Sequence, residues 1–120
     1  MSKSLYDRLG GANGIANIVD DVVAAHLENP VVRTRFAHVE DLDHLKKMAC
    51  DFFCAGSGGP ETYTGKDMRA AHEGMNISEQ EYLAVMDDIL GALDKRGIDE
   101  DTKKDVLAIL YSLKGEIIRV

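Results

Sequence analysis

Apolar residues recur at helical spacing along four stretches of the chain. The clearest stretch is residues 13–28, and its apolar face consists of Ile15, Ile18, Val19, Val22, Val23 and Leu27. A second stretch follows Asp41 or Asp43, either of which can cap a helix, and it ends near residue 54. Two more stretches follow Ser78 and Asp99. This recurrence is typical of amphipathic helices, and no alternating pattern of useful length indicates a strand, so an all-α fold is predicted.

Glycine and proline residues divide the first half of the chain. Residues 4–9 are predicted to form a short helix that ends at Gly10–Gly11. Asn29–Pro30 ends the next helix, because the residue before a proline avoids helical backbone angles. The proline is then expected to open a short helical turn that runs through Phe36. The glycine-rich run of residues 55–60 is expected to end the helix that follows.

The second half of the chain begins with the longest irregular stretch, residues 55–66. Loops of this length in compact domains are often functional. A short helix is predicted over residues 67–74. Ser78 and Glu81 then form a capping-box pattern, in which each side chain satisfies a free N–H group, and this helix is expected to stop at Gly97. The whole pattern predicts four substantial helices and two minor ones.

Size and charge limit the functional classes. The 120 residues suit one domain, residues 1–120, and 45% of them are apolar, which is enough for a core. The 14 Lys and Arg residues against 21 Asp and Glu residues make nucleic acid an unexpected partner. No apolar run is long enough to cross a membrane, and the N-terminal residues do not resemble a secretory signal. A cytoplasmic location is therefore the default expectation.

His72 is the residue with the clearest potential for chemistry, since it lies on the short helix after the long loop. An ordinary surface or hydrogen-bonded histidine is the alternative. No pair among the four histidines has the spacing of a helical zinc or di-iron motif, so neither site is supported. Cys50 and Cys54 do not form a Cys-x-x-Cys motif. They are expected to be small, partly buried free thiols, with a reversible redox role as the alternative.

Several short motifs follow one another in a specific order. They are residues 5–11 (LYDRLGG), Phe36, residues 52–53 (FF), residues 58–60 (GGP), residues 63–65 (YTG), Met68 and His72. In this order and spacing, over about residues 4–118, the chain resembles the group 1 truncated haemoglobins. The resemblance implies a truncated globin-like two-over-two helical sandwich around haem b. One pair would be the helix of residues 13–28 with the helix after Asp43, and the two C-terminal helices would form the other.

The resemblance also implies a set of haem contacts, with His72 as the proximal ligand of the iron. The second ring nitrogen of such a ligand usually donates to a backbone carbonyl, and the carbonyl of Met68, four residues earlier, is the natural acceptor. Lys66 and Arg69 are expected to pair with the haem propionates, with a solvated charge as the alternative for Arg69. The other side chains expected to contact the haem are Phe36, Leu45, Met48, Ala49, Phe52, Phe53, Met68, Ile77 and Val85.

Three positions depart from the family pattern. The family usually holds bound oxygen with a tyrosine and glutamines, where this chain has Val23, Leu45 and Ala49. A hydrogen-bond donor to the partly negative oxygen is worth about 1–3 kcal/mol. Without one, oxygen is expected to bind less tightly and to leave faster, whereas carbon monoxide is affected less. The sequence therefore favours NO or CO as the diatomic gas and argues against stable oxygen storage, although oxygen binding and oxygen transport are roles that the resemblance implies.

Several alternatives stay open. His26 or His44 is a candidate to turn toward the gas, and Met48 is a candidate sixth ligand of the iron. The ordinary alternatives are an interhelix role for His26, an exposed His44 and a Met48 that fills the core. The function is also open: a haem enzyme that performs NO dioxygenation or peroxidase-type chemistry, with an electron donor or reductase, is one alternative. A helical interaction module without haem is another.

Overall fold

The computed structural model describes residues 3–120, so Met1 and Ser2, part of the segment assessed as a possible secretory signal, lie outside the described residues. Within this range the chain forms six α-helices and one 3-10 helix, and an isolated bridge between Ile77 and Ile118 is its one β-type pairing. The all-α prediction is confirmed. The elements are α1 (Leu5–Arg8), α2 (Gly11–Glu28), η1 (Arg33–Arg35), α3 (Leu42–Gly56), α4 (Met68–His72), α5 (Glu79–Lys95) and α6 (Glu100–Ile117).

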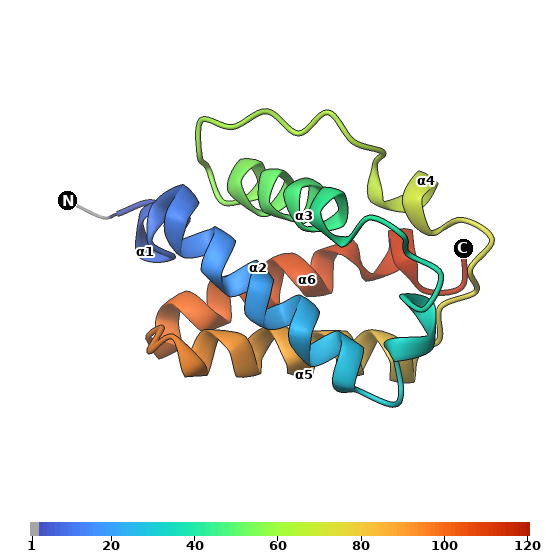
Figure 1. Ribbon diagram of the computed structural model, residues 1–120. Helices are drawn as coiled ribbons and strands as arrows, with labels where there is room; N and C mark the ends of the chain where they lie inside the picture. Colours follow the sequence, from blue (N-terminus) through green and yellow to red (C-terminus); the bar gives the residue numbers. More distant parts are fainter. Residues whose placement is uncertain (1–2) are drawn as a thin grey trace.

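The four long helices form a two-over-two sandwich, as expected. The most extensive contacts join α2 with α3 and α2 with α5, and α5 packs along α6 (Figure 1). The short helix α4 rests on α6 near the C-terminus. The stretch of residues 57–67 arches from the end of α3 to α4 and connects the two halves (Figure 1). None of the helices in the described part of the chain is both long and apolar enough to cross a membrane.

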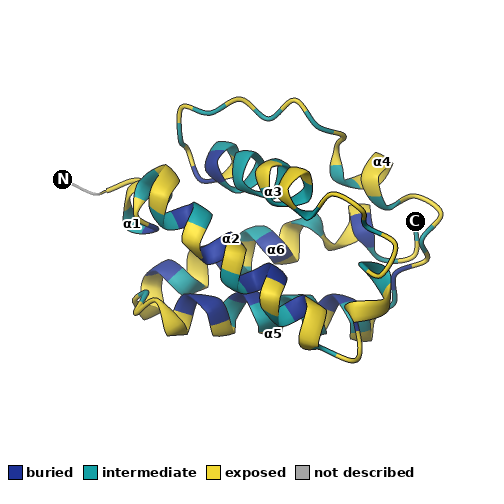
Figure 2. Ribbon diagram, viewed as in Figure 1, coloured by how far each residue is buried: buried dark blue, intermediate teal, exposed yellow. Residues whose placement is uncertain are grey.

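Two hydrophobic clusters hold the helices together. The main cluster draws on α1, α2, α3, α5 and α6, and its buried stripe follows α2 and α5 (Figure 2). Its buried members are Leu9, Ile15, Ile18, Val19, Val22, Val23, Cys54, Ile89, Ala92, Leu93, Val106 and Leu110. A smaller cluster of Ile77, Tyr82 and Ile117 lies where α4, α5 and the end of α6 meet, and the Tyr82 hydroxyl donates to the carbonyl of Leu110 at 2.6 Å. The second cluster therefore anchors the segment that follows α4.

The predicted helix caps are confirmed. Ser78 and Glu81 form the complete capping box at the start of α5. Asp99 caps α6 by accepting from the backbone and the hydroxyl of Thr102. Of the two candidates for α3, Asp41 is the cap, because its carboxylate accepts from the backbone N–H of His44 at 3.0 Å. Each of these caps satisfies N–H groups that the first helical turn leaves free.

Some boundaries differ from the sequence-based prediction. Helix α2 begins at Gly11 rather than near residue 13, because Gly10 takes the left-handed conformation (φ 96°) that allows a sharp entry. Helix α3 continues to Gly56 instead of ending near residue 54, and Ser57 closes it by donating to the carbonyl of Phe53. The helical turn expected from Pro30 through Phe36 is limited to the three residues of η1, Arg33–Arg35. Helix α4 is shorter than residues 67–74.

Replacing Leu93 with alanine tests the main cluster. Leu93 is 1% exposed, and a cavity at such a site is expected to lower the free energy of unfolding by about 2–5 kcal/mol. The matched control is Leu83→Ala on the same helix, where the side chain is 58% exposed and the expected change is within about 0.5 kcal/mol. Urea unfolding of both variants measures the difference. Equal losses in the two variants would contradict the assignment of Leu93 to the buried face of α5.

Candidate haem site

His72 is the last residue of α4, a helix of five residues that Asp67 caps. The Nδ1 atom of His72 lies 2.7 Å from the carbonyl oxygen of Met68, so the predicted hydrogen bond is confirmed. In this bond Nδ1 carries the hydrogen and donates, which leaves the lone pair of the neutral ring on Nε2. The side chain is partly exposed, and Nε2 is the nitrogen with which a histidine binds a metal from this orientation.

Helix α3 carries an apolar face that protein covers incompletely. Leu45, Met48, Ala49 and Phe52 follow the i, i+3, i+4, i+7 spacing of one helix face, and each is only partly buried. Cys54 is the one fully buried residue among the fifteen of this helix. A face of this kind usually has a partner, because exposed apolar surface of this extent is unfavourable in water. Protein covers part of this face, since Ala49 packs on the main cluster and Phe52 on Tyr63, and an apolar ligand would cover the rest.

The packing of α3 and α4 leaves their facing sides available. Helix α3 packs on α2, and α4 packs on α6, whereas no comparable contact joins α3 with α4 in the described residues. The loop of residues 57–67 arches between them (Figure 1). A flat apolar group that carries a metal fits this arrangement, since His72 offers Nε2 from α4 and α3 offers its apolar face. Haem has both properties.

The loop is fixed at two places by tyrosines. The Tyr6 hydroxyl donates to Glu61 at 2.8 Å, and the ring lies so close to Gly59 that an added Cβ would come within 2.4 Å of it. Tyr63 packs edge-on against Phe52, with ring centroids 5.2 Å apart, and donates to the carbonyl of Lys66. The loop motifs that carry the family resemblance therefore have a structural role, which is to hold this segment beside α3.

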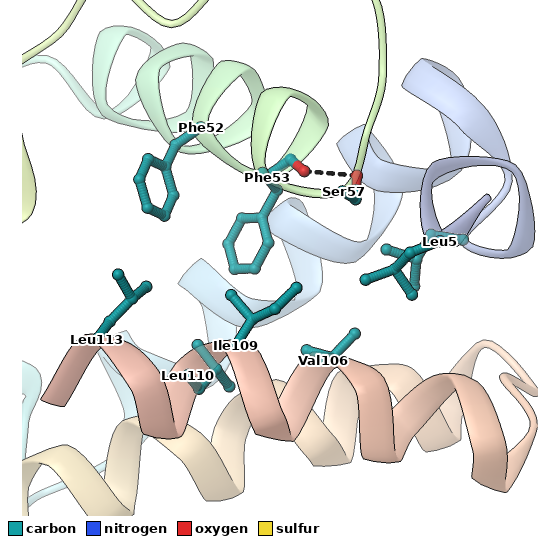
Figure 3. Close-up of a pocket in the computed structure, with 10 residues that line it drawn as sticks. Leu5, Phe52, Phe53, Ser57, Val106, Ile109, Leu110 and Leu113 are labelled. Carbon is teal, nitrogen blue, oxygen red and sulfur yellow. Dashed lines mark hydrogen bonds between the residues drawn. The ribbon is translucent and has the colours of Figure 1, made fainter.

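An apolar cavity of about 160 Å³ lies between the end of α3 and α6 (Figure 3). Phe52 and Phe53 point from α3 toward Ile109 and Leu113 of α6, and Leu5 of α1 lies at the far end. His72 does not line this cavity. Ile109 and Leu113 were not among the candidate site residues, because no sequence signal separates a core position from a cavity wall.

The two histidines that the sequence offered as partners of the gas, His26 and His44, both take the ordinary alternative roles. His26 is buried between α2 and α5, where its Nδ1 lies 2.7 Å from a carboxylate oxygen of Asp88. Its ring stacks on Phe36, with centroids 5.4 Å apart and planes 15° from parallel. His26 therefore has the interhelix role that was its ordinary alternative. His44 is exposed, which was also its ordinary alternative.

The other predicted contacts are spread around the same region. Met68 packs on the smaller cluster, in which Ile77 is fully buried, while Val85 is partly buried against the main cluster. Lys66 and Arg69 are exposed, and neither forms an ion pair with another described residue. Their charges are therefore free to meet an anionic group at the edge of the site. Within residues 3–120, no group of three His, Cys, Asp or Glu side chains gathers as a metal site, and an axial haem ligand needs none.

A charged clamp supports the segment after His72. Arg35 donates from Nε and Nη2 to the two carboxylate oxygens of Glu81, at 2.5 and 2.9 Å, and from Nη1 to the carbonyl of Met75 at 2.9 Å. The hydrogen bond from Arg35, assisted by the Ser78 backbone N–H, lowers the pKa of Glu81 from 4.5 to about 2.

The two cysteines are free thiols, as predicted. Burial raises the pKa of the Cys54 thiol to about 11, and the nearby Glu61 carboxylate adds to the shift. Burial also raises the pKa of Cys50. Thiolates are the reactive form of cysteine, so these shifts favour inert side chains.

The helical sandwich, the partly exposed apolar face of α3 and the oriented ring of His72 are together the features of a globin of the two-over-two class. The model of the bacterial-like globin family matches residues 4–119. The chain belongs to this family, and within it to the group 1 truncated haemoglobins, because the group 1 truncated haemoglobin of Tetrahymena pyriformis is 30% identical over 116 residues. That match covers 97% of this chain and 95% of the relative.

Further relatives and solved structures agree. The group 1 truncated haemoglobin of Mycolicibacterium paratuberculosis is 29% identical over 95% of this chain and 83% of its own length. The crystal structure of the Tetrahymena pyriformis protein in its Fe(III) form superposes with a TM-score of 0.94 at 25% identity, over 98% of this chain and all of that one. The 2/2 haemoglobin of Synechococcus, solved with covalently attached haem, gives 0.85 at 26% identity, over 93% and 94%. This chain is therefore a haem-binding globin that binds gas ligands, and haem iron is its cofactor.

Acid is expected to remove the stability that the clamp provides. Because the pKa of Glu81 is about 2 in the folded chain and near 4.5 when unpaired, its contribution is complete above pH 4.5 and declines as the pH falls toward 2. Glu81→Gln keeps the capping geometry without the charge. Its loss of unfolding free energy relative to the native chain should be larger at pH 6.5 than at pH 3.5. Glu79→Gln, at an exposed position two residues earlier in the same helical turn, is the control, and an equal pH trend in both variants would contradict the assignment.

Proposed function

We propose that residues 1–120 act as one globin domain that holds haem b through His72 and reversibly binds a diatomic gas. The observation that carries the proposal is the 2.7 Å hydrogen bond from His72 Nδ1 to the carbonyl of Met68. This bond fixes the tautomer and the orientation of the ring, and it makes Nε2 a stronger ligand. The bound haem supplies the iron to which the gas binds.

Residues of this chain would cover the haem on both faces. On the side of α3, the apolar face that includes Leu45, Met48, Ala49 and Phe52 supports this role, since protein buries each of these side chains only in part. On the other side, His72 is held by α4 and the smaller cluster. The exposed Lys66 and Arg69 would pair with the propionates, and solvent would screen those pairs. The further contacts in the proposal are Phe36, Phe53, Met68, Ile77 and Val85.

The side of the haem where the gas binds would be apolar. Val23 is buried in the main cluster, and Leu45 and Ala49 lie on the open face of α3, so none of the three positions offers a hydrogen-bond donor. Oxygen gains about 1–3 kcal/mol from such a donor, and NO and CO depend on it less. We therefore propose fast exchange of oxygen and a preference for NO or CO, in place of stable oxygen storage or transport.

The contacts of the histidines favour gas binding over the enzymatic alternative. Peroxidase-type turnover needs an acid–base group beside the reacting ligand. Of the two candidates for this group, His26 is held by Asp88 and stacked on Phe36, and His44 is exposed. NO dioxygenation remains the enzymatic candidate, and it depends on the same donor that this side lacks. Met48 is partly buried on α3 and stays the candidate sixth ligand.

The proposal includes an electron donor and a location. A donor or reductase would keep the iron ferrous, which is the state that takes up oxygen and CO. We place the protein in the cytoplasm, and its free thiols support this, since reduced cysteines are typical of that compartment.

His72→Ala is expected to abolish the native haem spectrum. The native chain with one equivalent of haem should give a sharp Soret band that CO shifts after reduction, and the variant should lose or alter that band. Added imidazole should restore it, because imidazole enters the space left by the side chain. His38→Ala, at an exposed position, is the control. A native spectrum in His72→Ala would exclude this histidine as the ligand, and a native chain that behaves as free haem would overturn the proposed function.

Leu45→Gln is expected to slow the release of oxygen. The amide adds a donor where the native chain has none, and a gain of about 1–3 kcal/mol corresponds to a dissociation rate about 5- to 150-fold lower. Leu45→Met is the matched control, because it keeps the size of the side chain without a donor. Stopped-flow dissociation of oxygen and CO from the reduced, haem-loaded proteins measures the effect. Slow oxygen release from the native chain, or equal rates in both variants, would contradict an apolar pocket.

A further inference from the structure

Arg35 bridges two parts of the chain that lie far apart in sequence. Its guanidinium holds the carboxylate of Glu81 on α5 with two hydrogen bonds and the carbonyl of Met75 with a third. Arg35 is the last residue of η1, so Phe36 follows it directly. Met75 precedes α5 and lies three residues after His72. One side chain therefore connects the corner before α3 with the segment after the proximal histidine.

The connection continues to His72 through the backbone. The N–H of Met75 donates to the carbonyl of His72 at 3.0 Å, while the carbonyl of Met75 accepts from Arg35. The two peptide groups that flank the Cα of Met75 are therefore each held by a hydrogen bond, which leaves this residue little freedom to rotate. The position of Arg35 thus constrains the carbonyl of the histidine that carries the proposed iron ligand.

Helix α4 needs this outside support because it is short. A helix of five residues is unstable by itself, since the cost of forming its first turn is not recovered by later turns. Other hydrogen bonds to the segment come from the C-terminus: Gly74 donates to Val120, and Arg119 donates to Ile77. Among the hydrogen bonds of residues 3–120, the bond from Arg35 to the Met75 carbonyl is the one that reaches residues 73–78 from the N-terminal half of the chain.

Glu81 gives Arg35 a rigid base. Its carboxylate also accepts from the backbone N–H of Ser78 at 3.1 Å, as part of the capping box that begins α5. The side chains of Arg35 and Glu81 are 31% and 17% exposed, so water screens the pair only in part. Two parallel hydrogen bonds between a guanidinium and a carboxylate set direction as well as distance.

We propose that Arg35 is a positioning residue for the proximal ligand. By binding the Met75 carbonyl and the Glu81 carboxylate together, it sets the position of His72 relative to Phe36. This inference rests on the proposed function, because it takes His72 as the iron ligand and Phe36 as a haem contact. Its consequence is that haem retention and the orientation of the imidazole depend on an ion pair outside the set of haem contacts. Loss of the clamp would leave α4 attached to α6 and free to shift with respect to the corner before α3.

Three variants test the proposal. Arg35→Met removes the clamp and keeps the length of the side chain. Arg35→Lys keeps the positive charge and loses the two-pronged geometry. Arg33→Met is the matched control, since Arg33 belongs to the same short helix, is exposed and forms no ion pair with a described residue.

Three measurements separate positioning from general stability. The first is the rate at which haem transfers from each protein to excess apomyoglobin. The second is the iron–histidine stretching band in the resonance Raman spectrum of the reduced, haem-loaded protein. The third is amide hydrogen exchange in the haem-free chain, at the hydrogen-bonded N–H groups of Ala71, Glu73 and Met75. The third measurement needs no haem, and exchange in α6 serves as its internal reference.

Arg35→Met should lose haem about 10- to 100-fold faster than the native chain, which is the usual effect of removing a partner that orients a metal ligand. Its iron–histidine band should shift, and exchange should rise at residues 71–75 while α6 keeps its protection. Arg35→Lys should fall between, and Arg33→Met should match the native chain. A native band and native haem loss in Arg35→Met, or faster exchange spread evenly over the chain, would overturn the proposal. Absence of an iron–histidine band in the native protein would instead overturn the proposed function on which it rests.

Discussion

The structure depends on one constraint, which is that α3 and α4 stay apart while each is held firmly. Their anchors are different: α3 packs on α2, and α4 packs on α6. Because Cys54 is the one fully buried residue of α3, the protein core leaves part of the apolar surface of this helix for another group to cover. Haem fills that role in a globin, so its binding contributes to the stability of the fold as well as to function.

Helix α5 provides the contacts that fix the segments leading into and out of the site. Three of its residues reach outward to three different segments: Glu81 to the corner that carries Phe36, Tyr82 to the backbone of α6, and Asp88 to the end of α2. The Asp88 carboxylate also accepts from the side chain of Asn29, which shapes the turn before η1. These are polar contacts at the margins of two hydrophobic clusters. The clusters supply most of the stability, and the polar contacts set the directions in which the connecting segments leave.

Much of this could be predicted from the sequence, because helix patterns and caps are local. The spacing of apolar residues on α2 and the box of Ser78 and Glu81 need only a few neighbours to be recognised, and the bond from His72 to Met68 follows from the pitch of a helix. The end of α3 was missed by two residues, since the hydroxyl of Ser57 continues the pattern where the glycine run suggested a break. The clamp of Arg35 had no sequence signal at all. Its partners lie 40 and 46 residues away, and an arginine on a short exposed turn has many possible partners until the fold is known.

The apolar residues that we propose to face the gas would also affect folding. A polar side chain at Leu45 or Ala49 would be solvated in the haem-free chain, whereas the native side chains expose apolar surface there. This raises the free energy of the open, haem-free state relative to the loaded one and makes binding of haem more favourable. Apolar residues at these two positions would therefore weaken the binding of oxygen and strengthen the binding of haem. Two properties that look independent, the choice of gas and the retention of haem, are linked by the burial of one helix face.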